Sequence, residues 1–301
     1  MLSLHTNSSL LSALDGLDRT GSALAVSQTR LSTGYRINSA QDDAAGLQLA
    51  TRLASQSSGM KVAMRNTQNA VSMLQTADSL LGEVGNILNR MSDLAIMAAD
   101  GSVSDEDRVA MDAEYATLSE QVLSNMHNSS YAGKYLMRYV VAPPGPDGPG
   151  TMGSGPMSFQ IGASAEETLT VDFRQGLGQL NVSLYYAINN GHLYGQPYDG
   201  PGTDLTSAAS ANLLIDKLAD ALKDVSTLRS QFGATANRLD SAYSNLSTMT
   251  TNTDAVRGRI MDVDYGSETA TMTANQMLAQ AGTAMIKNSL SALQLVKSLL
   301  E

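Results

Sequence analysis

The sequence predicts a mainly α-helical protein: a rod of long helices in coiled-coil or bundle contact, with paired terminal helices and a small β-hairpin excursion. Apolar residues recur at alternating spacings of four and three over unusually long runs, which is typical of helices that pack side by side. These runs lie on both sides of a central segment that is rich in proline and glycine. The chain holds 3 Phe and 0 Trp among 301 residues, so aliphatic residues and 16 Met must fill the interior.

The first apolar run predicts one helix from Leu4 to about Thr33. Its stripe contains Leu10, Leu14, Leu17, Leu24 and Leu31. Gly34 follows the last turn, as glycine commonly does at the end of a helix. One such stripe is too narrow to offset the conformational entropy that the segment loses on folding. We therefore expect this segment to need a partner, and the carboxy-terminal run provides one.

The second run, from about Ala44 to Ala99, predicts a helix that is roughly 80 Å long. Ser39 or Asp42 is expected to cap its start, and Asp42 and Asp43 place negative charge at its positive end. The leucines on its apolar stripe include Leu74, Leu81 and Leu88. This stripe should face another helix of similar length.

A third helix is predicted after a turn at Asp100 and Gly101. Ser104 is a suitable cap, and the acidic residues at 105–107 lie at the positive end of the helix dipole. We expect this helix to end near His127.

The helical spacing disappears between Tyr131 and Asp204. The proline and glycine residues of 143–156 predict an exposed loop. Apolar residues alternate with polar ones within 159–173, which predicts a β-hairpin. The same alternation over 182–188, followed by Asn-Asn-Gly at 189–191, predicts a second hairpin.

The helical spacing returns near Ser207 and continues to Ile260. Its stripe includes Leu222, Phe232, Leu239, Tyr243 and Leu246. This run is too long for an ordinary globular helix, so we expect it to pack along the second helix. After a break at 262–266, a last amphipathic helix is predicted from Met272 to Leu300. Its apolar residues include Leu278, Met285, Leu290, Leu293, Leu295 and Leu299.

Two parts of the chain resemble the terminal signatures of bacterial flagellins. They are Leu31–Leu53 in the first half, and Leu228–Gly233 together with Arg259–Tyr265 in the second. The resemblance implies an inner core of paired terminal helices (1–41 with 262–301), an outer-core helical bundle (42–137 with 205–261) and a minimal variable region (138–204).

A flagellin is a structural subunit of the helical filament that drives bacterial motility. The resemblance implies that other copies of the chain are its main partner, and that the terminal segments fold as they enter the polymer. It also implies a flagellar export chaperone, a filament cap and junction proteins, type III export and an extracellular location. The alternatives are a hook–filament junction protein, which shares both terminal helices, a non-flagellar signalling or scaffold coiled coil, and a helical-bundle enzyme.

The segment Ile87–Ile96 is similar to the flagellin helix face that the flagellin-sensing Toll-like receptor of animals grips. Arg90 and Leu94 in this segment, and Glu114 on the next helix, match the contact residues of the family. The resemblance therefore implies an innate-receptor contact at these residues. Contact with a neighbouring subunit is the alternative role of the same face.

The composition argues against several other classes of function. A formal net charge of -10 leaves no basic stripe for nucleic acid, and no apolar run approaches the roughly 20 residues that span a bilayer. With 0 Cys, the chain has neither disulfides nor a thiolate metal site. A helix start explains Asp42 and Asp43 better than a catalytic pair does, and 262–268 is too short for a calcium loop. We expect no enzymatic activity, no cofactor, no metal and no membrane insertion.

Overall fold

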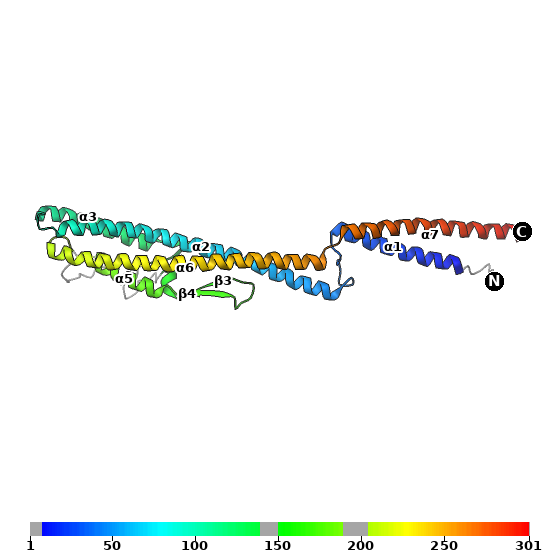
Figure 1. Cartoon of the computed structure of the whole chain (residues 1–301), viewed down its shortest axis with the longest axis horizontal. Helices are drawn as coiled ribbons and strands as arrows, with labels where there is room; N and C mark the ends of the chain where they lie inside the picture. The colour runs from blue at the N-terminus through cyan, green and yellow to red at the C-terminus, as the bar shows by residue number, and fades with distance from the viewer. Residues whose placement is uncertain (1–7, 139–149, 189–203, 301) are drawn as a thin grey trace. The chain divides into compact units, whose positions relative to one another are not determined.

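The computed structural model of the chain describes residues 8–138, 150–188 and 204–300, which are mainly helical, as predicted (Figure 1). The helices are α1 (Ser8–Thr33), α2 (Ala44–Ala99), α3 (Asp105–Asn128), α4 (Thr151–Ser154), α5 (Arg174–Ile188), α6 (Ala208–Met261) and α7 (Tyr265–Leu300). Two antiparallel strand pairs accompany them: β1 (Ser130–Tyr131) with β2 (Lys134–Tyr135), and β3 (Met157–Gln160) with β4 (Thr168–Val171). In the described part, no helix is long and apolar enough to traverse a lipid bilayer.

Contacts within the chain divide it into two compact units. Unit 1 comprises Met1–Ser58 and Met249–Glu301, and unit 2 comprises Gly59–Thr248. Unit 1 contains α1 and α7 with one end of each long helix, α2 and α6. Unit 2 contains the rest of both long helices together with α3, α4, α5 and the strands. The two units differ in how much apolar surface they bury.

The main apolar core lies in unit 2, where residues of α2, α3, α5 and α6 form one buried cluster. Its largest fully buried side chains include Tyr115, Phe173, Phe232, Leu81 and Met91. The rings of Phe173 and Phe232 meet edge to face, with their centroids 4.9 Å apart. The predicted stripe residues Leu74, Leu81, Leu88, Phe232, Leu239 and Leu246 are all buried. The long second and sixth helices therefore share a core, as their spacing predicts.

The buried stripe of α6 differs from the predicted one at alternate positions. Both contain Phe232, Leu239 and Leu246, which are buried. At other positions of the helix, the structure buries Leu214, Ala221, Leu228 and Thr235, whereas the predicted Leu222 and Tyr243 are half-buried. Adjacent residues on a helix are about 100° apart, so only the position of the partner helix decides which of them turns inward.

The turn between α2 and α3 is held by residues of α3. Ser104 caps this helix as predicted, because its hydroxyl accepts a hydrogen bond from the Asp107 backbone N–H at 3.2 Å. Arg108 is 5% exposed. Its guanidinium donates to the carbonyls of Ala98 and Asp100 at 2.7 Å each, and to that of Val103 at 3.3 Å. A buried cation thus satisfies a free carbonyl at the negative end of α2 and two carbonyls of the turn that follows.

Strands β3 and β4 form the predicted hairpin, with Phe159 opposite Leu169. The turn of this hairpin approaches α2 closely at Gly59. A Cβ atom placed on Gly59 would lie 2.8 Å from the Cβ of Ala163, which is closer than real contacts allow. This approach explains a glycine in the interior of a long helix, where glycine normally weakens the helix.

The second predicted hairpin is wrong, because residues 182–188 belong to helix α5. Buried side chains on one side of α5 are Leu177, Leu180, Leu184 and Ile188, which follow the helical spacing. The Tyr115 hydroxyl donates to the carbonyl of Ala187 at 2.5 Å and so fixes the end of α5 to α3. The expected turn at 189–191 and the first part of the predicted loop, 143–149, lie outside the described residues.

A carboxylate with a lowered pKa lies at the start of α5. The Asp172 carboxylate accepts hydrogen bonds from the Arg174 side chain, at 2.6 Å to Nη2, and from its backbone N–H at 3.0 Å. These bonds lower the pKa of Asp172 from 3.8 to about 2. A depressed pKa stabilises the folded state above the ordinary carboxyl pKa, and this contribution disappears as the pH falls through the folded value.

We expect Asp172→Asn to lower the thermal midpoint of unit 2 at pH 7, and the difference from the natural protein to vanish near pH 2. Circular dichroism melts across this pH range measure both effects. Asp93→Asn, at an exposed aspartate of α2, is the control and should leave the midpoint unchanged at pH 7. A difference between Asp172→Asn and the natural protein that is the same at pH 7 and pH 2 would contradict the assignment.

Candidate assembly interface

Helices α1 and α7, from opposite ends of the chain, pack against each other in unit 1 (Figure 1). The leucines of α1 that are half-buried are Leu10, Leu17, Leu24 and Leu31. The half-buried residues of α7 include Met272, Asn275, Ala279, Gly282 and Ile286. A Cβ atom on Gly282 would lie 3.5 Å from Leu17 Cδ1, in ordinary van der Waals contact. The two terminal runs are therefore partners within one chain, as expected.

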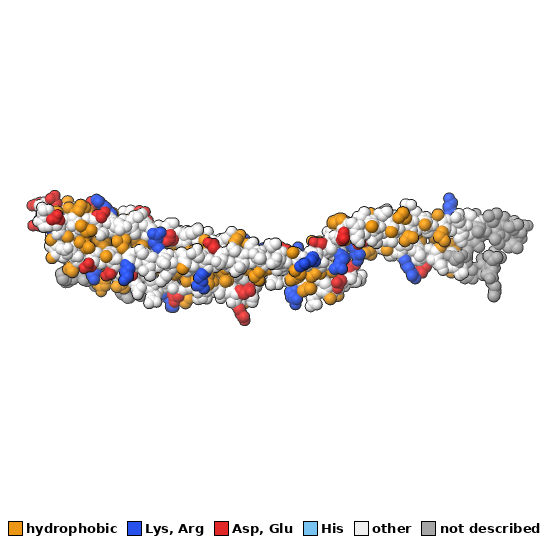
Figure 2. All heavy atoms as spheres, in the orientation of Figure 1, with side chains coloured by type: hydrophobic (Ala, Val, Ile, Leu, Met, Phe, Trp, Pro, Cys, Tyr) orange, Lys and Arg blue, Asp and Glu red, His pale blue; other side chains and the backbone are white. Residues whose placement is uncertain are grey.

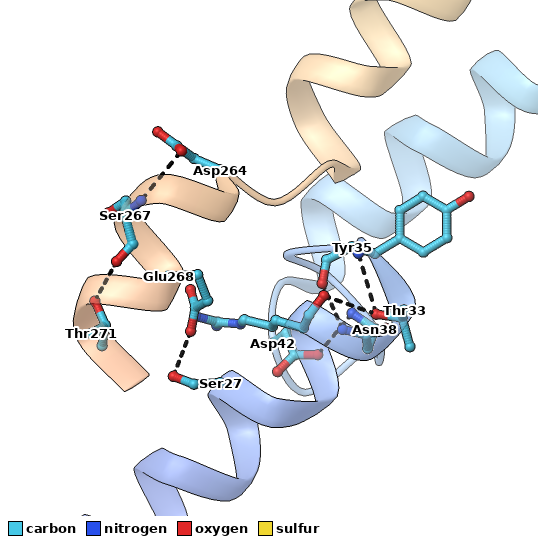
Figure 3. A network of polar contacts seen from close by, with 10 residues as sticks. Ser27, Thr33, Tyr35, Asn38, Asp42, Asp264, Ser267, Glu268 and Thr271 are labelled. Atoms are coloured by element: carbon cyan, nitrogen blue, oxygen red, sulfur yellow. Dashed lines mark hydrogen bonds and ion pairs between the residues drawn. The ribbon is translucent and has the colours of Figure 1, made fainter. Parts of the chain in front are cut away.

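A polar network crosses the α1–α7 contact (Figure 3). The Ser27 hydroxyl, on a residue that is 2% exposed, donates to Glu268 Oε1 at 2.6 Å. Arg30 Nη1 lies 3.5 Å from Glu268 Oε2. Burying polar groups costs free energy unless they are paired, so this network favours one alignment of the two helices. It was not predicted from the sequence, although Ser27 is a polar residue at a position of the α1 stripe.

The connection from α1 to α2 lies beside the connection from α6 to α7. The Arg36 backbone N–H donates to the Met261 carbonyl at 2.7 Å, and the Val263 N–H donates to the Gly34 carbonyl at 3.0 Å. Gly34 has a φ of 77°, in the left-handed region that favours glycine, and it ends α1 as predicted. Backbone hydrogen bonds thus tie the end of α1 to the segment that leads into α7.

The cap of α2 is Asp43, so the expectation of Ser39 or Asp42 is wrong. Asp43 Oδ1 accepts a hydrogen bond from the Gly46 backbone N–H at 2.8 Å. Asp42 instead faces the preceding turn, where it accepts a hydrogen bond from the Asn38 backbone N–H at 3.0 Å (Figure 3). It also accepts one from the Ser39 backbone N–H at 2.8 Å. These bonds lower the pKa of the Asp42 carboxyl. Adjacent aspartates therefore have separate structural roles.

Helix α7 begins at Tyr265, about two turns before the predicted Met272. Asp264 Oδ1 accepts hydrogen bonds from the backbone N–H groups of Gly266 and Ser267, at 2.9 and 3.3 Å. Asp264 is therefore the cap of α7. The early turns of this helix carry Glu268, so the earlier start is what brings that carboxylate to α1.

Helix α7 presents three faces, because successive residues are about 100° apart. One face packs on α1. A second face is polar and exposed, with Thr273, Gln276, Gln280, Thr283, Lys287 and Ser291. The third, which we call the uncovered apolar face, consists of the exposed residues Ala274, Met277, Leu278, Ala281 and Met285. Met277, Leu278 and Met285 on this face are 60%, 59% and 66% exposed.

Unit 1 buries little apolar surface in its described part. Its buried apolar side chains there are Ile37 and Ala50, whereas both buried apolar clusters belong to unit 2. Figure 2 shows apolar side chains at the surface over the α1–α7 pair. Contiguous apolar surface in water is unfavourable and marks sites of protein contact. The α1–α7 pair therefore presents an exposed apolar surface, which is a candidate site of protein contact.

The predicted terminal stripes divide into two groups. Leu10, Leu17, Leu24 and Leu31 face α7. Leu14, Leu278, Met285 and Leu290 are exposed, by 42%, 59%, 66% and 47%. The side chains of Leu293, Leu295 and Leu299 lie outside the described residues. One part of each stripe is therefore packed within the chain, and the other part is exposed at its surface.

The three residues predicted to contact the receptor do not all lie at the surface. Arg90 on α2 and Glu114 on α3 form an exposed ion pair, with Nη2 and Oε1 2.7 Å apart. Leu94 is 2% exposed and belongs to the core of unit 2. Its side chain is therefore not part of the surface around Arg90.

The described residues contain no group of three or more His, Asp or Glu side chains that could hold a metal ion. The aspartates considered above as catalytic or calcium-binding, Asp42, Asp43 and Asp264, hold turns and helix starts instead. The chemistry of this region is that of packing between helices.

Comparison with known proteins identifies the family. The N-terminal helical region of bacterial flagellin matches residues 4–141, and the C-terminal helical region of bacterial flagellin matches residues 215–300. Polar flagellin B/D of Vibrio parahaemolyticus is 29% identical, with 99% of each chain covered. Flagellin A of Vibrio anguillarum is also 29% identical, over 95% of this chain and 96% of that protein.

A solved structure supports the fold. It is named as that of a flagellar hook-associated protein from Vibrio parahaemolyticus, and it matches with a TM-score of 0.54 and 17% identity, over 73% of this chain and 100% of that one. At this identity the likeness speaks to the fold alone. With both terminal helical regions matched by the flagellin models, this chain belongs to the bacterial flagellin family.

Proposed function

We propose that this flagellin polymerises through its α1–α7 pair, and that neighbouring copies complete the folding of the pair by covering its open apolar surface. As a flagellin, the chain is a structural subunit of the flagellar filament. The observation that carries the proposal is the low burial of unit 1. Met277, Leu278 and Met285 are more than half exposed, whereas unit 2 has a continuous core.

The energetic reason is that a pair of helices with one narrow contact gains little from folding alone. The half-buried leucines of α1 offset only part of the conformational entropy that ordering costs. Contact with identical copies adds buried apolar area without a new kind of partner, so assembly and folding become one step. A contact of this kind that does not close on itself produces an open helical polymer.

The proposal also assigns roles to the parts of the chain. We propose that 1–41 with 262–301 form the inner core of the filament, and that 42–137 with 205–261 form its outer core. The segment 138–204 is then the small variable region. Export by the flagellar type III route, an export chaperone, a filament cap and junction proteins complete the set of proposed partners, and the filament is extracellular.

An innate-receptor contact is a finer proposal for unit 2. The exposed Arg90–Glu114 ion pair supports it, because both side chains are accessible on α2 and α3. Leu94 would then support the site from the core and would not touch the receptor. Binding to the ectodomain of the flagellin-sensing Toll-like receptor, compared between the natural protein and Arg90→Asp, tests this contact. Equal binding would remove it.

Growth from short filament seeds tests the proposed function. Purified natural protein should extend the seeds, as seen by negative-stain microscopy. Removal of about 30 residues from either end should abolish growth while unit 2 remains folded, as measured by circular dichroism. Growth of both trimmed proteins at the natural rate would refute the role of the terminal pair.

A further inference from the structure

The oxidisable sulfur of this chain is all in thioethers, since it has 16 Met and 0 Cys. Their exposure varies widely. The methionines with buried side chains are Met60, Met73, Met91, Met126, Met137 and Met152, which are 0–7% exposed. The exposed ones among the described residues are Met97, Met249, Met277 and Met285, at 41%, 45%, 60% and 66%. Core packing accounts for the first group but not for the second.

The two most exposed methionines occupy one surface. Met277 and Met285 both lie on the uncovered apolar face of α7, with Leu278 between them in sequence. About two turns separate them on the helix, so their sulfur atoms belong to the same strip that the proposed function places against a neighbouring copy. A small oxidant in water can reach these sulfurs in the free subunit, whereas it cannot reach those in the core of unit 2.

We propose that Met277 and Met285 are oxidation sites through which a peroxide stops the subunit from entering the polymer. The inference rests on the proposed function, because it requires that this face be buried on assembly. A lone pair of the thioether sulfur attacks one oxygen of hydrogen peroxide, the O–O bond breaks, an S–O bond forms, and water leaves. The sulfur loses two electrons and the peroxide gains them, so the product is methionine sulfoxide.

The product changes the surface from apolar to polar. A sulfoxide oxygen is a strong hydrogen-bond acceptor, whereas most of the uncovered apolar face, including Ala274, Leu278 and Ala281, offers it no donor. Gln280 and Asn288, one turn after Met277 and Met285, are the nearest exposed amide donors that follow them. Burial of an unpaired acceptor is unfavourable, so each sulfoxide should raise the concentration needed for growth by about tenfold. Methionine sulfoxide reductases restore the thioether, and the switch is therefore reversible.

Assembly should protect the same atoms. In the polymer the uncovered apolar face is covered by another copy, so peroxide has no access to Met277 and Met285 there. Oxidation then acts on free subunits and leaves finished filaments intact. Comparing sulfoxide formation in peroxide-treated monomer and in peroxide-treated filaments therefore tests whether Met277 and Met285 are buried on assembly.

The experiment treats natural monomer and natural filaments with hydrogen peroxide, locates sulfoxides by peptide mass spectrometry, and measures extension of seeds. We expect sulfoxide at Met277 and Met285 in monomer but not in filaments, and loss of growth by the oxidised monomer. The variant Met277→Leu/Met285→Leu keeps volume and apolarity, and its growth after peroxide treatment should equal its own growth without treatment. The control Met97→Leu/Met249→Leu, which removes the other two exposed methionines of the described residues, should still lose growth.

The outcomes separate this inference from the proposed function. If untreated natural protein does not extend seeds, the proposed function fails first. If untreated protein grows and oxidised protein grows equally well, the oxidation switch is wrong while the proposed function stands. The switch is also wrong if Met277→Leu/Met285→Leu stays as sensitive as the natural protein, or if filaments are oxidised at both sites as fast as monomer.

Discussion

Leu278→Glu/Met285→Glu should abolish extension of filament seeds while the free subunit keeps its fold. Both side chains are exposed in the single chain, at 59% and 66%, so glutamate at these positions stays in solvent there, and neither residue belongs to unit 2. In the polymer, two carboxylates would have to be buried on an apolar face without partners, which is strongly unfavourable. We expect growth to fall at least about a hundredfold, measured by seeded extension at fixed subunit concentration.

A matched control places the same charges elsewhere on the same helix. Gln276 and Gln280 lie on the polar exposed face of α7, and Gln276→Glu/Gln280→Glu adds the same two negative charges. This variant should extend seeds within about tenfold of the natural rate, because carboxylates on a polar face keep their solvent. If both double variants fail equally, the effect is one of net charge and not of the uncovered apolar face.

Phe232→Ala should destabilise unit 2 by about 3–5 kcal/mol, the usual cost of removing a buried aromatic ring. Phe232 is 1% exposed and packs edge to face on Phe173 at 4.9 Å, so its loss leaves a cavity between α6 and the start of α5. Urea unfolding of the full-length monomer, followed by circular dichroism, measures the change in the free energy of unfolding.

The control for Phe232 lies on the same helix. Leu213 is 52% exposed, and Leu213→Ala should change stability by less than about 0.5 kcal/mol. A loss below about 1 kcal/mol for Phe232→Ala would mean that the core of unit 2 does not depend on the aromatic contact. Because we expect the terminal helices to contribute little to the unfolding signal of the monomer, the measured loss of unfolding free energy should report on unit 2.

Helix boundaries could be predicted from the sequence where their signals are local. The run from Ala44 to Ala99 is bounded as predicted, since Asp100 and Gly101 stop it and Ser104 starts the next helix. Gly34 ends α1 for a reason that is local as well, its left-handed φ. Capping at α2 was harder, because Ser39, Asp42 and Asp43 are all suitable residues and only backbone geometry decides among them.

The choice of buried residue, or of helix over strand, could not be predicted where it depends on packing against other parts of the chain. Ala221 and Leu222 are adjacent apolar residues of α6, and the packing of this helix against its neighbours determines that Ala221 is the buried one. Over 182–188 the apolar residues satisfy a strand and a helix equally, and the buried Leu177 and Leu180 upstream settle the choice. The open and packed faces of α7 could not be told apart from the sequence either, because both carry apolar residues and only the position of α1 distinguishes them.

The Ser27–Glu268 hydrogen bond joins residues that are 241 positions apart. Nascent chains therefore contain α1 long before α7 leaves the ribosome, and this contact cannot form until synthesis is nearly complete. A translation product that stops before α7 contains α1 but lacks the helix against which α1 packs. If polymerisation uses the α1–α7 pair, as we propose, subunits that lack either end are excluded from the filament.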